Sequence, residues 1–236
     1  MGNLRGMPPH SSVLLTVPTR PLAAAPHTPF SIDVLQALRN ATAAQHAQLD
    51  TGLAIAQPDA SLHDYGLHAH ALAAWLQALS PHLNTLQASE HHFEFAPADR
   101  LAALAADLRD IALVSPGAAP RAWPAPSVST QEHVGRALND NPTQTEAVCW
   151  GLVYVVEGSQ LGGQVLYRHL APRLAPHPLR YLQGHASRTG ARWKSFVALL
   201  CERVTSQADV AACCQGAQAA FEGLQQHFWE TEGVPT

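Results

Sequence analysis

The chain has 236 residues, of which 47% are hydrophobic and 14% charged, and its formal net charge is −4. This composition is typical of a globular protein and not of a disordered one, and the length is sufficient for one sizeable core. No long basic run argues for nucleic acid as a partner, and no apolar run reaches the roughly 20 residues of a membrane span.

Three features of the chain bear on its organisation and location. Residues 1–30 are rich in proline, which predicts a flexible or extended tail. The apolar run 13–17 is short and stops at Pro18, so a signal peptide is not expected. The cysteines form no CxxC pair and are expected to be small buried hydrophobes in a reducing cytoplasm: Cys149, Cys201, Cys213 and Cys214. We therefore expect a cytoplasmic protein.

A body of helices follows the tail, expected as one domain over residues 31–230. Apolar residues at helical spacing predict a first helix over 33–56. Ser61-Leu-His-Asp64 resembles a capping box and opens a second helix that reaches Leu86. A third helix is expected over 98–113, and the four prolines within 115–129 predict a loop.

The second half of the body is also predicted to be helical. Thr143-Gln-Thr-Glu146 has the pattern of another capping box and would start a long helix that ends near Leu170. Two further helices are expected over 187–205 and 207–229. No segment alternates apolar and polar residues as a strand does, so the predicted fold class is all-α, a single-domain multi-helix bundle.

A histidine lies on the apolar face of the first predicted helix. His46 shares a stripe with Leu35, Leu38, Thr42 and Leu49. Such a histidine can be a hydrogen-bonded core residue, or its imidazole can bind a metal or haem iron. Taken alone, the pattern favours the core residue. The pairs at 68 and 70 and at 91 and 92 do not share one helix face, and these histidines are expected at the surface.

The long predicted helix contains glycines that cost it stability. Gly158 and Gly162 are four residues apart and share a face, and Gly163 follows. Each costs a helix interior about 1 kcal/mol relative to alanine. Either another helix packs closely here, or the backbone lies against a flat cofactor. The pattern alone leaves both interpretations open.

Together, three segments resemble the haem oxygenase family. Residues 38–46 (LRNATAAQH) are similar to its proximal helix, and residues 157–166 (EGSQLGGQVL) to its distal helix. Residues 154–163 (YVVEGSQLGG) are closest to the bacterial branch, including the enzymes that supply biliverdin to bacteriophytochromes, and residues 190–196 (GARWKSF) also resemble that branch. The order and spacing of the segments agree with the family over about residues 33–205. The resemblance implies a haem-oxygenase-like helical bundle.

The resemblance also assigns roles to residues. It implies that His46 is the proximal iron ligand, and that the distal wall, which contacts the reacting ligand, is formed by Gly158, Gly162 and Gly163. Ser159 stands where the mammalian branch has an aspartate that anchors distal water, so this chain has a hydroxyl there and no charge. Near the haem propionates, the resemblance implies Arg39 and, as weaker candidates, Lys194 and Arg192.

The activity implied is oxidative cleavage of haem to biliverdin, carbon monoxide and ferrous iron. Haem is then both cofactor and substrate, and the reaction needs dioxygen and an external electron donor, either a ferredoxin or a flavin reductase. A bacteriophytochrome is an implied acceptor of biliverdin. The alternatives are a haem-binding protein without turnover, a helical oxidase with a non-haem di-iron centre, and a purely structural helical domain. The di-iron alternative is disfavoured because the chain has no Glu-x-x-His motif.

Overall fold

The computed structural model describes residues 33–115 and 122–232, and every regular element in these ranges is a helix. The all-α prediction is confirmed. The predicted tail at 1–30 and the first residues of the predicted domain lie outside the described ranges. The α-helices are α1 (Val34–Gly52), α2 (Leu62–Ser89), α3 (Pro97–Val114), α4 (Val128–Asp140), α5 (Thr145–Leu170), α6 (Arg180–Gln183), α7 (Thr189–Arg203) and α8 (Gln207–Glu232), and the 3-10 helices are η1 (Ala54–Ala56) and η2 (Ala186–Arg188).

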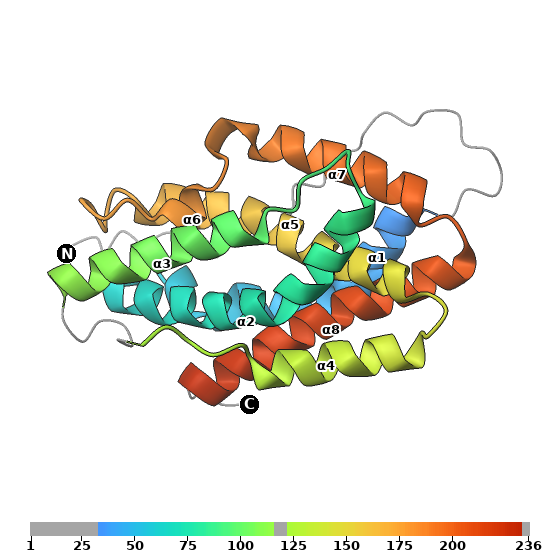
Figure 1. Cartoon of the computed structure of the whole chain (residues 1–236). Helices are drawn as coiled ribbons and strands as arrows, with labels where there is room; N and C mark the ends of the chain where they lie inside the picture. Colours follow the sequence, from blue (N-terminus) through green and yellow to red (C-terminus); the bar gives the residue numbers. More distant parts are fainter. Residues whose placement is uncertain (1–32, 116–121, 233–236) are drawn as a thin grey trace, which may run out of the picture.

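Helix α8 is the centre of the bundle. It contacts α1, α2, α4 and α5, and Figure 1 shows it passing between α4 and α5. The indole of Trp75 on α2 donates a hydrogen bond of 2.9 Å to the carbonyl of Ala220 on α8, which fixes these two helices together. The largest fully buried side chains of the core include Trp75, Trp150, Tyr65, Phe95, Phe196 and Phe228.

Two glycines allow α5 and α8 to touch through their backbones. A Cβ atom at Gly151 would overlap the carbonyl oxygen of Cys213, and one at Gly216 would overlap that of Val148. Because backbone cannot yield as a side chain does, these positions on α5 and α8 require glycine. Beyond this contact the two helices separate towards their C-terminal ends (Figure 1).

Of the two predicted capping boxes, the structure contains one and lacks the other. The capping box at Ser61 is confirmed, since its hydroxyl accepts from the Asp64 amide and the Asp64 carboxylate accepts from the Ser61 amide. The box predicted at Thr143 is wrong. Its hydroxyl donates to the Gln144 side chain, and α5 begins only at Thr145, without a side-chain cap.

Three other boundaries differ from the predictions. The loop predicted over 115–129 is too long at its end, because Ser127 caps the missed helix α4 by accepting a hydrogen bond of 3.2 Å from the Thr130 amide. Helix α1 ends at Gly52, and the separate turn η1 completes the predicted 33–56 segment. The predicted 187–205 helix is divided into η2 and α7.

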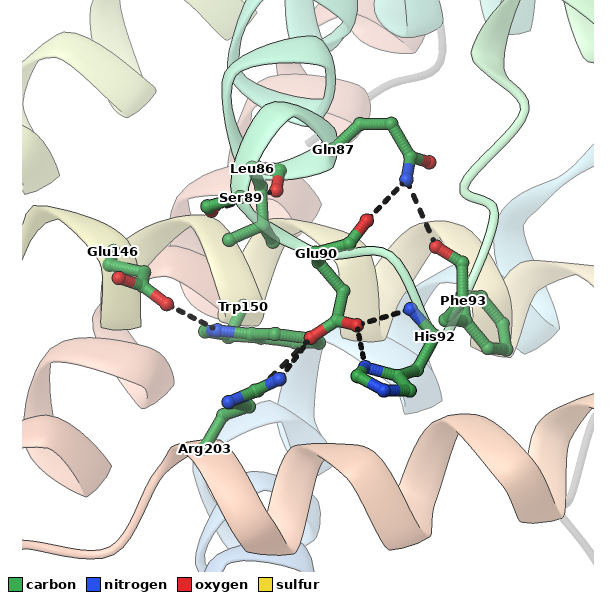
Figure 2. A network of polar contacts seen from close by, with 9 residues as sticks. All are labelled: Leu86, Gln87, Ser89, Glu90, His92, Phe93, Glu146, Trp150 and Arg203. Atoms are coloured by element: carbon green, nitrogen blue, oxygen red, sulfur yellow. Dashed lines mark hydrogen bonds and ion pairs between the residues drawn. The ribbon is translucent and has the colours of Figure 1, made fainter.

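A buried carboxylate ties the end of α2 to the end of α7. Glu90, only 2% exposed, accepts hydrogen bonds from the Arg203 guanidinium at 2.7 and 3.0 Å and from the His92 amide at 2.6 Å (Figure 2). Burial raises the pKa of Glu90, but these hydrogen bonds outweigh it, so the pKa lies below its usual value. Glu90 therefore stays ionised and holds the two helix ends together.

All four cysteines are free; Cys149 and Cys213 are buried and Cys214 is partly buried, but Cys201 is exposed, so the expectation of burial is wrong for that residue. Of the helices described, none combines the length and the hydropathy that crossing a membrane would require.

Candidate functional site

A cavity of about 500 Å³ occupies the space beside the C-terminal half of α5, within the 300–1,000 Å³ usual for small-molecule sites. Its walls come from α1, α2, α5 and α8, with further contributions from α6, η2 and the start of α7. Most of its lining is apolar, including Leu72, Trp75, Val155, Leu166, Leu182, Phe221, Leu224 and Phe228. A large flat apolar ligand suits such a lining.

His46 lines this cavity from α1. Its ring stands edge-on to Phe221 of α8, with the ring centroids 4.6 Å apart. Burial lowers the pKa of His46 below 6.5, so the imidazole is neutral at neutral pH. A neutral imidazole offers a ring nitrogen lone pair, which is the form that binds metals.

The glycine segment of α5 lines the same cavity through Gly158, Ser159, Gly162 and Gly163. A Cβ atom at Gly158 would meet only ring carbons of Trp193, at 3.7 and 3.8 Å. At Gly163 it would lie 3.7 Å from the nearest atom of Leu182. These are ordinary van der Waals distances, so close helix packing does not require glycine here as it does at Gly151. The backbone of α5 is instead bare towards the cavity.

An ion-pair cluster holds α7 against this part of α5. The carboxylate of Glu157, which is 3% exposed, accepts from Arg100 of α3 at 2.6 Å and from Arg192 of α7 at 2.9 Å. Arg192 also lies 4.3 Å from the centroid of the Phe93 ring. Its guanidinium is therefore already bound by groups of the protein itself. The next residue, Trp193, lies beside Gly158, with two ring carbons 3.7 and 3.8 Å from the position that a Cβ would take.

The predicted basic residues do not line the cavity, but another one does. Arg39 is half-buried and Lys194 is exposed, and neither contributes to the cavity wall. Arg168, near the end of α5, does line it and is exposed, with its Nε donating to the Gln164 carbonyl at 3.2 Å. Among the described lining residues, only Arg168 carries a permanent charge. The helical spacing of Leu161, Val165 and Arg168 is the signal that sequence reasoning missed.

His68 is buried, which contradicts the prediction that it lies at the surface. It is 7% exposed, lines the cavity from α2, and stacks on Phe228 with the centroids 5.3 Å apart. Burial lowers the pKa of His68 to about 4. The stripe Tyr65, His68, Leu72, at helical spacing, indicates this inward position; comparing His68 only with its neighbour at 70 concealed it.

The other histidines of these pairs lie further out. His70 is half-buried, and its Nε2 lies 3.2 Å from the Ala122 carbonyl. His91 and His92 are exposed, as predicted. Within 33–115 and 122–232, no three side chains of histidine, cysteine, aspartate or glutamate converge as a metal site would require.

Comparison with known proteins agrees with this geometry. The family model described as Heme oxygenase matches residues 32–230. A heme oxygenase of Xanthomonas campestris pv. campestris (strain 8004) is 46% identical over 83 residues, which are 34% of this chain and 49% of the relative. The aligned segment thus spans about half of that relative's length. The family match, however, covers nearly all the described helices, and the chain belongs to the haem oxygenase family.

Proposed function

We propose that this protein is a haem oxygenase, which opens haem oxidatively to biliverdin, carbon monoxide and ferrous iron with dioxygen and an external electron donor. One observation carries the proposal: His46 and the bare glycine backbone of α5, from distant parts of the sequence, line the same cavity. A metal ligand on one wall and glycine backbone on another suit a flat metal-containing substrate. The family match supports the same substrate.

His46 is proposed as the ligand of the haem iron. Its lowered pKa keeps the imidazole neutral, and the contact with Phe221 restrains the ring. His46 would hold the iron through a ring nitrogen, and haem, when bound, would supply the oxygen chemistry that opens its ring. The role of the protein is to bind, orient and enclose that substrate.

Gly158, Gly162 and Gly163 are proposed to form the opposite wall. Without Cβ atoms, the helix backbone can approach the ligand face closely and limit the directions that a small ligand on the iron can take. The Ser159 hydroxyl donates to the Val156 carbonyl at 2.8 Å, which leaves its oxygen lone pairs as acceptors for water. Protons on this side would therefore move through neutral groups.

Basic residues near the cavity are proposed to bind the haem propionates. Arg168 lines the cavity and is exposed, so it is the strongest candidate for a charge-assisted hydrogen bond with a carboxylate. Arg39 and Lys194, which do not line the cavity, are proposed as further propionate partners. Arg192 does not serve as one, because its guanidinium is bound to Glu157.

A spectroscopic experiment tests the proposal. Purified protein with haem, dioxygen and a reductant is expected to lose the Soret band and to develop the spectrum of biliverdin. His46→Ala should slow this conversion at least about 100-fold, as expected when a metal ligand is lost. His70→Ala, on α2 and outside the cavity lining, is the matched control and should convert haem normally. A stable, unconverted haem complex of the natural protein would instead indicate haem binding without turnover.

The proposal extends to partners and location. A ferredoxin or a flavin reductase would supply electrons, a bacteriophytochrome would accept biliverdin, and the protein would work in the cytoplasm. The likeness of the glycine segment to the bacterial branch of the family supports these partners. Turnover rates measured with each class of reductase, and transfer of the product to an apo-bacteriophytochrome, test them separately.

A further inference from the structure

The cavity has a closed end and an open end. The closed end is formed by α2 and α8, where Leu72 is 5% and Phe228 2% exposed. At the open end, Arg168 of α5 and Gly190 of α7 are exposed. A ligand that carries its charges on one edge will therefore place that edge at the open end, where the charges stay hydrated near Arg168.

His68 lies in the closed end and has an unused polar atom. It is 7% exposed, and neither ring nitrogen has a hydrogen-bond partner among the described residues; Nδ1 is fully enclosed, which leaves Nε2 as the nitrogen that a ligand in the cavity can reach. Stacking on Phe228, with 12° between the ring planes, fixes the orientation of the imidazole. A neutral imidazole always has one N–H donor and one acceptor nitrogen, and leaving such a group buried and unpaired is unfavourable. The position needs a polar partner, and the apolar lining does not provide one.

Haem itself has no polar group to offer at that end. Its two carboxylates share one edge of the ring, and the opposite edge consists of hydrocarbon around a meso carbon. When that edge is opened, the meso carbon leaves as carbon monoxide, and each of the two ring carbons it joined gains an oxygen from dioxygen. The external donor supplies the electrons that reduce the remaining oxygen to water. The product thus presents two lactam oxygens where the substrate had none.

We propose that the His68 imidazole binds the ring-opened product by donating a hydrogen bond to a lactam oxygen at the closed end of the cavity. His68 then distinguishes the product from the substrate. It retains biliverdin after the ring has been opened. The imidazole gains its hydrogen-bond partner only when the ring has been opened at the edge opposite the propionates. This inference rests on the proposed function and assigns a further binding contact to the same site.

Direct titration with biliverdin tests the contact without turnover. His68→Phe keeps the ring and its stacking on Phe228 but removes the polar atoms. It should weaken biliverdin binding about 5- to 10-fold, the value of one ordinary hydrogen bond, and leave haem affinity within about twofold. His68→Gln, which keeps a donor and an acceptor, should restore most of the affinity. The same change at a neighbour outside the cavity lining, His70→Phe, should alter neither.

Two results would overturn the inference. One is unchanged biliverdin affinity in His68→Phe, and the other is an equal loss of haem and biliverdin affinity, since His68 would then only shape the cavity. If His68→Phe does not fold, His68→Gln against His68→Met repeats the test, because only glutamine hydrogen-bonds strongly. Failure of the natural protein to convert haem would contradict the proposed function, whereas the contrast in biliverdin affinity concerns His68 alone.

Discussion

The two halves of α5 contain glycine for different reasons. In the first half, Gly151 lies against the backbone of α8, and a Cβ there would overlap the Cys213 carbonyl. In the second half, Gly158 has only the edge of the Trp193 ring within reach, and a Cβ would fit. The first glycine is explained by the fold, and the second is not. The atoms that an added Cβ would contact therefore distinguish a glycine required by helix packing from a glycine that faces a ligand.

The strongest test of this contrast is Gly151→Ala. Because the added Cβ meets backbone atoms of α8, at Cys213 and Ala217, the two helices must move apart, and the variant should lose about 3 kcal/mol of unfolding free energy. Chemical denaturation followed by circular dichroism measures this loss. A variant as stable as the natural protein would contradict the packing role of Gly151.

Because His68 is buried in the cavity wall, the unfolding free energy of the protein should depend on pH. The pKa of His68 is about 4 in the folded protein and 6.5 for an ordinary imidazole, so between these values the unfolded chain binds the extra proton. Stability should therefore be highest above pH 6.5 and fall as the pH drops towards 4, by up to about 3 kcal/mol from this group. Urea denaturation at several pH values measures the slope.

The matched variant for this slope is His68→Phe. It removes the titrating group but not the ring, so the curve of the variant should be flatter than that of the natural protein over the same pH range. Parallel curves would mean that His68 is hydrated or paired in the folded protein, and that the closed end of the cavity is not as dry as its lining indicates.

The second half of α5 should respond in the opposite way. Gly158→Ala adds a Cβ that has room and removes a residue that weakens helices, so unfolding free energy should stay the same or rise by up to about 1 kcal/mol. Biliverdin formation should nevertheless slow, because the added methyl group takes up space beside Trp193 in the lining of the cavity. Stability and turnover measured on one preparation test both statements. A loss of stability similar to that of Gly151→Ala would abolish the distinction between the two halves.

The smallest expected effect concerns the charges at the open end. Arg168→Gln should weaken haem binding by up to about fivefold, the range of an exposed ion pair, and less so at high salt. Lys194→Gln, which does not touch the cavity wall, is the control and should change haem affinity less. Titration with haem, followed by its absorption, measures both. The reverse order would make Lys194 a stronger propionate partner than Arg168.

Local sequence signals were sufficient for the helical class and for most helix positions, because apolar spacing and the Ser61 capping box depend on neighbouring residues. They failed at Thr143, where the hydroxyl bonds to the adjacent glutamine, and at α4, which follows a proline-rich loop. His46 and the glycine segment were recognised as two motifs. That they share one cavity depends on contacts through α8, which no local pattern contains.

The residues missed at the site have a common property. His68 and Arg168 belong to no motif, and each lies on a helix face whose neighbour comes from elsewhere in the chain. Conversely, Arg192 was a plausible carboxylate partner by sequence, but a carboxylate of the protein itself, Glu157, already occupies its guanidinium. Which charge pairs with which is decided by tertiary packing.

Trp193 and Trp75 both line the cavity, whereas the other tryptophans, Trp123, Trp150 and Trp229, do not. Haem absorbs light at the wavelengths at which tryptophan emits, and energy transfer between them is most efficient at short range. The natural protein therefore contains its own fluorescent indicators of occupancy, which can follow ligand entry and release without any label.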